Sequence, residues 1–488
     1  MEKFKNPVLL CDYSDPDAIR VGDEFFMVAS SFNYVPGLPV LRSKDLVHYE
    51  VISYVCKELF QRFDKVIPGD GIWAPSIRYH DGFFYVVIPM YDEGIYVSKS
   101  KSAYGPWSKP HLLNSTKGLI DPCPFWDKDG KTYIACGFAK SKIGFNSKLA
   151  FFEVDDKLTK TLSDYTIIYD GRMTQPVIEG PKVYYINDYY FILAPAGSVK
   201  TGWQLALRSK NIYGPYEEKI ILMQGDSKVN GPHQGALIDI NDDKYVFMHF
   251  QDLDNYGRVC HIQDVNFIEG WPICGIDTGN FVGIPSLTYP YFLKKDDTLK
   301  INYTDFFKDK INESWQWPCN IKDNFYRIED GLLLNCIKKE NENYLYLERN
   351  RMMQKLALAN FKVKTTLDKR FLKETSKTGL CLMGFNYAYL EVSPKYISLK
   401  KGTKDTLDEI IEEVILESNE VTLLLDFTYP NQYRLGYIKD GFEEYFNYTF
   451  QATRDRWTGS KFGLYALSDD GNGYAKYLNF IVENKDVE

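Results

Sequence analysis

Three acidic residues in the first half of the chain have the chemistry of an acid–base site. Asp15 and Asp121 each precede a proline, and Glu179 precedes a Gly-Pro pair. One carboxyl group can donate a proton to a leaving oxygen while another takes a proton from water. A third carboxylate nearby would raise the pKa of the acid by like-charge repulsion and keep it protonated near neutral pH. An Asp before proline is also a common turn former, so this chemistry requires that the fold bring the three acids together.

A repeated hairpin predicts the element that positions these acids. Aromatic and β-branched runs flank short polar turns at a period of roughly 50 residues, and the turn markers are Asp23, Gly82, Gly130, Asp188 and Asp242. Eight or nine residues before the five markers lie Asp15, Trp73, Asp121, Glu179 and His233. In a β-propeller every blade offers its innermost strand to a shared axis. We therefore expect these five side chains to ring one central pocket.

The strand pattern predicts an all-β chain in two parts. Long helical periodicity is missing from the first half of the sequence. We expect a five-bladed β-propeller over residues 1–288, a linker over 289–302, and a β-sandwich over 303–488, where short alternating strands recur. The segment 407–416 fits an amphipathic helix or a strand, because its β-branched residues suit both patterns.

Composition excludes several classes of partner. The chain has 488 residues and a net charge of −8, which disfavours nucleic acid and anionic membranes. Its nine cysteines form no CxxC pair, which indicates reduced thiols and a cytoplasmic location. The first residues lack the apolar core of a signal peptide, and no run reaches the roughly 20 apolar residues of a membrane span. We find no P-loop and no dinucleotide fingerprint. A homo-oligomer is compatible with these features.

Four ordered segments on this repeat phase resemble the signature blocks of glycoside hydrolase family 43. They are residues 14–23, 71–79, 118–122 and 178–181. Members of that family are five-bladed propellers that cleave β-xylosides, α-L-arabinofuranosides or arabinans with inversion. The second half, with Trp-Gln-Trp at 315–317 and the segment 456–463, resembles the jelly-roll, concanavalin-like β-sandwich attached to many xylosidases of the family.

The resemblance implies a role for each acid. Asp15 would be the general base that activates water, Glu179 the general acid, and Asp121 the residue that tunes the pKa of Glu179 and orients it. Inversion requires space for a water molecule between base and substrate, so the carboxyl groups of Asp15 and Glu179 should lie roughly 6.5–9.5 Å apart.

The resemblance also implies residues that contact substrate. Arg258 matches a family arginine that points into the pocket; the alternative is a surface arginine. Phe32 and Trp73 would form apolar walls, although Trp73 could be core packing. His233 matches a family histidine at the axis, where it could ligate a structural calcium ion or a water cluster, or simply be a satisfied core residue. Trp457 is a candidate for a sandwich loop that closes the pocket, and otherwise a core tryptophan. No cofactor is required for catalysis.

These features predict an exo-acting β-xylosidase. It would release xylose from the non-reducing end of β-1,4-xylo-oligosaccharides, small enough to be imported. The alternative is an α-L-arabinofuranosidase, or an enzyme with both activities, acting on arabinoxylan or arabinan fragments. The fructosidase group, which shares the architecture, would need Asn-Asp-Pro-Asn-Gly near the start, where this chain has Ser-Asp-Pro-Asp. A non-catalytic carbohydrate-binding propeller would typically lack one of the three carboxylates.

Overall fold

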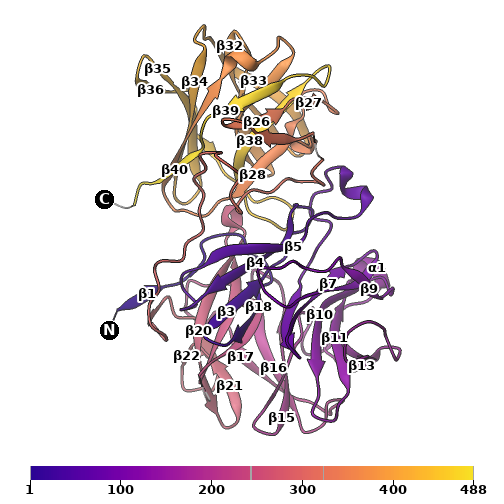
Figure 1. The fold of residues 1–488 in the computed structure, drawn as a ribbon. Coiled ribbons are helices and arrows are strands. Elements are labelled where there is room, and N and C mark those ends of the chain that lie inside the picture. The colour runs from indigo at the N-terminus through magenta and orange to yellow at the C-terminus, as the bar shows by residue number, and fades with distance from the viewer. Residues whose placement is uncertain (1, 242–243, 323, 487–488) are drawn as a thin grey trace.

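The computed structural model describes residues 2–241, 244–322 and 324–486, and the regular secondary structure of these residues is almost entirely β-strand. A propeller lies below a sandwich in Figure 1. The few helical turns are short: α1 (Lys140–Ile143), η1 (Gln61–Asp64), η2 (Asp254–Tyr256), η3 (Leu345–Leu347) and η4 (Lys369–Phe371). Within the described ranges, no helix has the length and apolar character needed to cross a bilayer.

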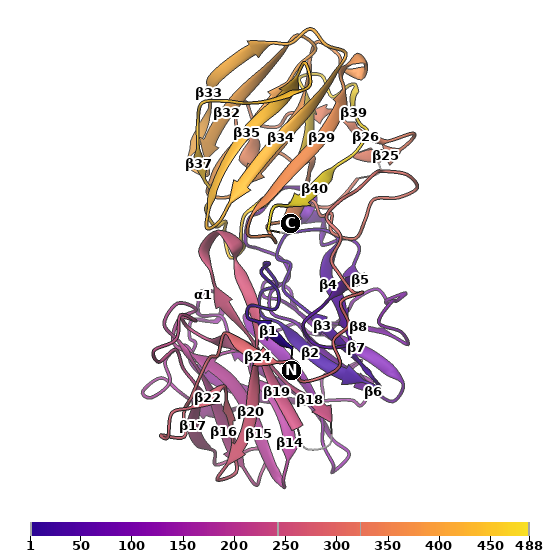
Figure 2. The ribbon, with the colours of Figure 1, turned by 90° about the vertical axis from the view of Figure 1, so that its left-hand side faces the viewer.

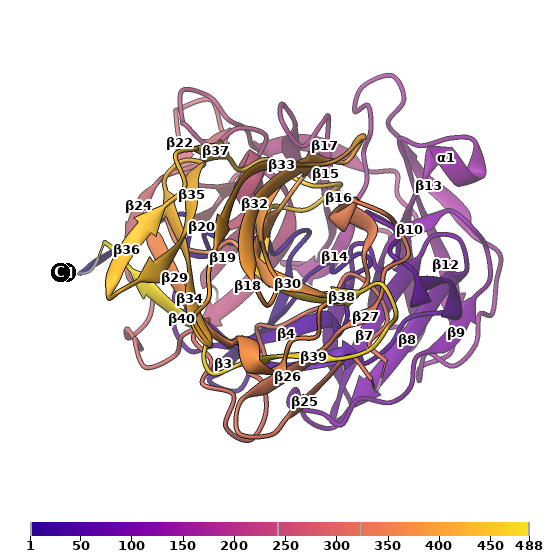
Figure 3. The ribbon, with the colours of Figure 1, turned by 90° about the horizontal axis from the view of Figure 1, so that it is seen from above.

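Five sheets form the propeller blades, and each has a core of four antiparallel strands; the sheet of the fourth blade carries two further strands. Seen from above, they are arranged around one axis beneath the sandwich (Figure 3). Blade one is β2 (Asp17–Val21), β3 (Glu24–Val28), β4 (Gly37–Ser43) and β5 (Glu50–Cys56). Blade two is β6 (Ser76–His80), β7 (Phe83–Met90), β8 (Gly94–Ser100) and β9 (His111–Asn114). Blade three is β10 (Leu119–Trp126), β11 (Thr132–Phe138), β12 (Lys148–Val154) and β13 (Thr166–Asp170).

The last two blades complete the ring. Blade four is β14 (Lys182–Ile186), β15 (Tyr189–Ala196), β16 (Trp203–Ser209) and β17 (Glu217–Leu222), extended by β23 (Gly283–Ile284) and β22 (Ile276–Asp277). Blade five is β18 (His233–Asn241), β19 (Lys244–Asp252), β20 (Arg258–Ile268) and β21 (Trp271–Cys274). Strand β18 contacts β2 of the first blade, which closes the circle. The predicted five-bladed propeller is confirmed.

The predicted hairpins join the first two strands of the blades. In blade four, Asn187 and Asp188 have φ of 50° and 61° and lie between β14 and β15. Left-handed residues at both turn positions match the right-handed twist of the two strands. The markers Asp23, Gly82 and Gly130 lie between equivalent strands. The fifth marker, Asp242, lies outside the described residues.

Separate apolar cores between neighbouring blades hold the ring together. Phe26, Val28 and Val40 of blade one pack with Ile77 and Val86 of blade two, for example. Corresponding cores lie between the other blade pairs, including blades five and one. The aromatic and β-branched residues that predicted the strands are therefore the ones that bind each blade to the next.

The N-terminal segment reinforces the closure between blades five and one. Strand β1 (Lys3–Lys5) pairs with β24 (Thr288–Pro290). The buried Asn6 side chain donates to the carbonyl of Ile262 at 2.8 Å and accepts from its N–H at 2.9 Å. Leu9 forms a bridge to Cys260 of β20. The start of the chain thus runs along the last blade before it reaches Asp15.

The second half of the chain forms two sheets packed face to face. The first contains β25 (Tyr326–Ile328), β26 (Leu332–Asn335), β29 (Phe361–Asp368), β34 (Glu420–Thr428), β35 (Gln432–Lys439), β36 (Phe442–Tyr445), β37 (Phe450–Gln451), β39 (Tyr474–Tyr477) and β40 (Ile481–Asn484). The second contains β27 (Ile337–Lys338), β28 (Arg351–Lys355), β30 (Ser376–Met383), β31 (Asn386–Val392), β32 (Tyr396–Thr403), β33 (Thr406–Ile415) and β38 (Lys461–Ser468). The predicted β-sandwich is confirmed, and residues 407–415 of the ambiguous segment 407–416 lie in the strand β33.

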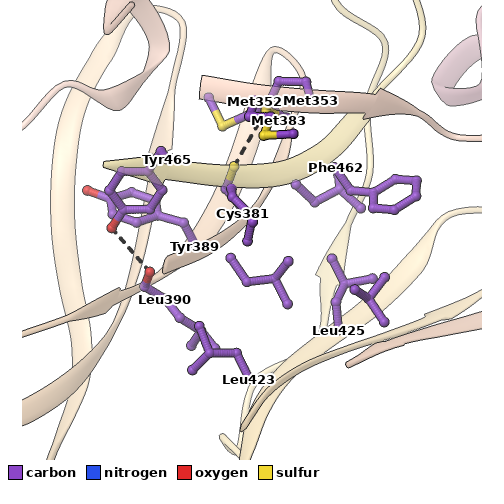
Figure 4. Packing of buried hydrophobic residues seen from close by; sticks show 14 of the residues in the cluster. Met352, Met353, Cys381, Met383, Tyr389, Leu390, Leu423, Leu425, Phe462 and Tyr465 are labelled. Atoms are coloured by element: carbon purple, nitrogen blue, oxygen red, sulfur yellow. Dashed lines mark hydrogen bonds between the residues drawn. The ribbon is translucent and has the colours of Figure 1, made fainter. Parts of the chain in front are cut away.

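The sandwich has its own hydrophobic core (Figure 4). Leu423 and Leu425 of one sheet and Cys381 and Phe462 of the other belong to it, and all four are buried. All nine cysteines of the chain are buried and free of disulfides. Figure 2 shows the sandwich above one end of the propeller. The exact boundaries predicted for the two domains and their linker stay a prediction.

Candidate active site

The five residues predicted from the repeat phase lie at the same end of the five inner strands. Asp15, Trp73 and Glu179 come two or three residues before β2, β6 and β14. Asp121 is the third residue of β10, and His233 is the first residue of β18. Because the inner strands surround one axis, these positions converge at one end of it.

Asp15 is held by two donors from different blades. The side chain is buried, and its Oδ2 accepts a 2.6 Å hydrogen bond from the Ser30 hydroxyl. Its Oδ1 accepts a 2.8 Å charge-assisted bond from Nη1 of Arg258 at the start of β20. Both oxygens therefore act as acceptors, the arrangement expected for a base. Asp15 also has a left-handed backbone (φ 53°), a conformation that non-glycine residues adopt mainly where surrounding structure imposes it.

Asp121 repeats this backbone conformation in blade three. Its φ is 54°, and it lies where the pairing of β10 with β11 shifts between Ile120 and Cys123. Oδ2 accepts a 2.8 Å bond from the N–H of Gly180, the residue after Glu179. Burial and the neighbouring Asp15 carboxylate raise the pKa of Asp121 to about 7, although the Gly180 N–H and Lys182 oppose the shift. Asp121 is thus linked to the segment that carries Glu179.

Glu179 has a raised pKa, as Asp121 does. Burial first, and then the Asp121 and Asp15 carboxylates, raise its pKa to about 8, with Arg258 opposing them. Its side chain nevertheless keeps 30% of its surface exposed, so it remains accessible. Its Oε1 lies 3.3 Å from Nε2 of His233. A protonated, accessible carboxyl group is what a general acid requires.

His233 is a neutral buried side chain. Burial and the nearby Arg258 and His249 lower its pKa to about 3. Its Nδ1 has no hydrogen-bond partner within the described part of the chain. The described residues contain no group of three or more His, Cys, Asp or Glu side chains that could hold a metal. The predicted calcium ion therefore has no support here.

The predicted aromatic residues lie around the same end of the axis. Phe32 is buried, has a φ of 52°, and forms a bridge to Ile72, the neighbour of Trp73. The Trp73 ring packs on Tyr91 with the centroids 4.4 Å apart. It also lies edge-on to Trp457 of the sandwich at 6.5 Å.

Trp457 is not a core residue of the sandwich. It is 46% exposed and has a φ of 62°. The Arg258 guanidinium lies 5.9 Å from its ring centroid, within range of a cation–π interaction. The sandwich thus places an aromatic side chain beside two residues of the propeller site. Arg258 itself is largely buried, which excludes the surface alternative for it.

Sequence reasoning missed several residues that hold the site. Ser30 and Gly180 bond to the acids, Tyr91 packs on Trp73, and the Arg258 guanidinium lies 4.9 Å from the ring centroid of Phe250. Gly180 could have been found, because it follows Glu179 within a motif already noted. Ser30, Tyr91 and Phe250 come from second strands or loops and carry no repeat signal.

The chain matches two family descriptions that together span most of its length. Residues 4–272 match glycosyl hydrolases family 43, and residues 303–483 match the beta xylosidase C-terminal concanavalin A-like domain. The first match alone covers more than half of the 488 residues. The chain belongs to glycosyl hydrolases family 43.

Curated relatives support this assignment. A putative beta-xylosidase of Xylanibacter ruminicola is 38% identical over 362 residues, covering 72% of this chain and 66% of that protein. A beta-xylosidase of Formosa agariphila is 32% identical, covering 67% of this chain and 60% of that protein. The chain therefore spans less than two thirds of the length of these relatives. A xylosidase/arabinosidase of Butyrivibrio fibrisolvens is 27% identical, covering 98% of this chain and 99% of that protein.

Solved structures show the same fold. A bifunctional GH43-CE structure from Bacteroides eggerthii superposes with a TM-score of 0.87 at 22% identity, covering 99% of this chain and 64% of that one. This likeness extends over both halves of this family 43 chain, propeller and sandwich alike.

Proposed function

We propose that this family 43 protein is an inverting, exo-acting β-xylosidase that releases xylose from the non-reducing end of β-1,4-xylo-oligosaccharides. The observation that carries the proposal is the set of three carboxyls at one end of the axis, with unequal surroundings. Asp15 accepts bonds from Ser30 and Arg258, whereas the pKa of Glu179 is raised to about 8. Two acids in such different environments suit the separate roles of base and acid.

The proposed reaction is a single displacement at the anomeric carbon. Asp15 takes a proton from a water molecule as the water oxygen attacks. Glu179 gives its proton to the glycosidic oxygen as the bond to the leaving sugar breaks. The configuration inverts because attack and departure occur on opposite faces. Asp121 sustains the protonated state of Glu179 by its charge, and through the Gly180 N–H it orients the segment that bears the acid.

Two features support action at a chain end. Trp457 of the sandwich stands beside Trp73 and Arg258, so the sandwich limits the space around the site on that side. The names of the first two relatives are those of β-xylosidases. We propose that the substrate is a small oligosaccharide, that the protein works in the cytoplasm on fragments from xylan degradation, and that catalysis requires no cofactor.

An α-L-arabinofuranosidase, or an enzyme with both activities, is the alternative. The full-length relative from Butyrivibrio fibrisolvens carries both names, xylosidase and arabinosidase. A panel of nitrophenyl glycosides distinguishes the two. Faster release from the β-D-xyloside supports the main proposal, and faster release from the α-L-arabinofuranoside supports the alternative.

Substitution of the two acids tests the mechanism. Glu179→Ala should abolish cleavage of xylobiose, whose leaving group needs a proton, yet spare nitrophenyl xyloside to a greater extent. Asp15→Ala should lose turnover on both substrates by about 10³-fold or more, because no group then activates water. Equal losses for Glu179→Ala on both substrates would argue against its role as the acid. Sugar binding without any turnover by the unsubstituted protein would favour a carbohydrate-binding module.

A further inference from the structure

A second group of charged side chains lies on the inner strands, a few residues beyond the site residues of the same segments. Lys182 and Asp17 have no exposed surface, and Arg78 is largely buried. None of the three takes part in the proton transfers described above. Asp17 lies two residues after Asp15 in sequence, and Lys182 lies three residues after Glu179. We call Asp17, Arg78 and Lys182 the axial charge layer.

The Lys182 ammonium connects three of the segments that build the site. Its Nζ donates to the carbonyl of Pro75 at 3.1 Å and to the Ser76 hydroxyl at 2.6 Å, just after Trp73 in the chain. The same Nζ lies 3.8 Å from Oδ2 of Asp17. One buried cation therefore contacts the segments that carry Asp15 and Trp73, and its own strand β14 follows Glu179.

Arg78 connects the remaining segment. Its Nη1 donates to Oδ2 of Asp17 at 2.7 Å, and its Nη2 donates to Sγ of Cys123 at 3.0 Å. Cys123 lies two residues after Asp121 on β10. The N–H of Ile77 also donates to Oδ2 of Asp17, at 2.9 Å. The axial charge layer thus joins the inner strands of blades one to four just beyond their site residues.

The layer separates the site from the other end of the axis. A hollow of about 420 Å³ there is lined by later residues of the inner strands, including Arg20, Arg78, Tyr184 and Asp239. Asp17 and Lys182 lie between that hollow and the acids in strand order. Because Asp17 and Lys182 are completely buried, the layer keeps water in the hollow away from the acids. Water there would otherwise screen the charges of the layer and weaken their effect on the acids.

The charges along this part of the axis do not balance when every acid is ionised. Four carboxyls, those of Asp15, Asp17, Asp121 and Glu179, lie with three basic side chains, those of Arg78, Lys182 and Arg258. The set is neutral when one carboxyl keeps its proton. A buried site with little water favours the neutral set. Other charged or titratable groups near these side chains are Asp12, Cys123, Tyr184, His233, His249 and Asp252.

We infer that Lys182 and Asp17 are positioning residues of the hydrolase, which hold the acid-bearing segments together and set the number of protons that the three carboxyls share. The inference rests on the proposed glycosidase function and extends it. Lys182 already lowers the pKa of Asp121, whose charge in turn raises that of Glu179. Because the charge of Asp121 acts on Glu179, a change of charge beside Asp121 should also move the apparent pKa of the acid.

Two substitutions test this inference, one that removes a positive charge from the layer and one that removes a negative charge. Lys182→Gln keeps a donor for Pro75 and Ser76 but removes the positive charge. The acid should then hold its proton to higher pH, and the basic limb of the kcat/KM profile should move up by about half to one pH unit. Asp17→Asn removes a negative charge from the same layer, so the basic limb should move down by a similar amount. A purely structural role would move neither limb.

Ser76→Ala is the matched control, since it removes one hydrogen bond of Lys182 and leaves every charge in place. The basic limb of the kcat/KM profile of Ser76→Ala should lie at the same pH as that of the unsubstituted protein. The inference would be overturned if the basic limb of the kcat/KM profile stayed in place in folded Lys182→Gln and Asp17→Asn. It would also be overturned if the limb moved in the same direction in both variants. If one of these variants fails to fold, the limb of the other decides. An unsubstituted protein that cleaves no aryl glycoside would instead refute the proposed function.

Discussion

The proposed role of Glu179 as the general acid requires that its carboxyl group keep its proton at the working pH. Burial and the Asp121 and Asp15 carboxylates raise its pKa to about 8, so the protonated acid should persist through neutral pH. We expect kcat/KM for xylobiose to fall as pH rises above about 8, because the acid then ionises. A pH–rate profile measures this directly. A basic limb near the ordinary glutamate range, around 4.5, would show that the site does not perturb Glu179.

The same raised pKa predicts a cost in stability. An acid whose pKa is higher in the folded protein than its ordinary 4.5 destabilises the fold progressively as pH rises from 4.5 to about 8. Glu179→Gln cannot ionise, so its free energy of unfolding should exceed that of the unsubstituted protein by roughly 1–3 kcal/mol at pH 8. The gain should vanish below pH 4.5. Denaturant unfolding at several pH values measures it, and a gain independent of pH would contradict the explanation.

A surface acid provides the control for that measurement. The Glu329 side chain is 63% exposed and pairs with Arg327. Glu329→Gln should change the free energy of unfolding by less than about 0.5 kcal/mol at each pH.

The acids could be predicted from the sequence, whereas their partners could not. Asp15, Asp121 and Glu179 occupy equivalent positions in the repeated hairpin. In a propeller, equivalent positions of the inner strands meet at the axis. Ser30 and Phe250 reach the site from other strands, so only tertiary packing reveals them. Lys182 is an intermediate case, because extending the phase by three residues beyond Glu179 would have pointed to it.

At the scale of the strand, the loop before β14 must bring Glu179 and Asp121 together without strain. Gly180 has a φ of 58°, and its N–H bonds to Asp121. A Cβ at this position would lie 2.8 Å from Cδ of the Gln234 side chain. Gly180→Ala should therefore lower kcat/KM by about tenfold or more, since small displacements of catalytic groups are costly. Steady-state kinetics with xylobiose measures the loss.

Gly82 is the matched glycine for this test. It has a φ of 77° in the turn between β6 and β7, and a Cβ there would meet no atom within 4 Å. Both alanine variants should lose about 1 kcal/mol of stability from backbone strain. Only Gly180→Ala should also lose activity. Equal activity losses would show that the effect comes from general destabilisation.

Strand hairpins and their order were readable from the sequence because each is a local pattern. The turn at Asn187 and Asp188 is an example, since two residues tolerant of left-handed φ separate two apolar runs. The strand β33 was ambiguous because exposed apolar residues, Leu407, Ile410 and Ile415, stand among its acidic residues. Such an edge strand lacks the clear alternation that a half-buried strand shows.

At the scale of the whole molecule, the sandwich contacts the residues of the candidate site and their neighbours. Besides Trp457, it contributes Lys461, which is buried and lies 3.9 Å from Asp12, three residues before Asp15. The main-chain N–H of Arg258 donates to the same Asp12 at 3.1 Å. A Cβ on Gly459 would lie 2.6 Å from the N of Gly257. Contacts of this kind join segments hundreds of residues apart, so no local sequence pattern could predict them.

Removal of the sandwich aromatic tests whether it serves the substrate. Trp457 is 46% exposed, so Trp457→Ala should leave stability within about 1 kcal/mol. KM for xylobiose should rise by about threefold to thirtyfold through lost ring contact. Phe442→Ala removes a 75% exposed aromatic from β36 of the sandwich and should leave KM unchanged. An unchanged KM in Trp457→Ala would restrict the sandwich to a structural role.

The stereochemistry of the first product tests the central proposal most directly. NMR spectroscopy of a nitrophenyl β-xyloside digest, recorded before mutarotation, shows which anomer of xylose is released first. If Asp15 activates water opposite the bond that Glu179 protonates, the α-anomer should appear first. Initial release of the β-anomer would mean retention through a covalent intermediate, and it would contradict the roles assigned to Asp15 and Glu179.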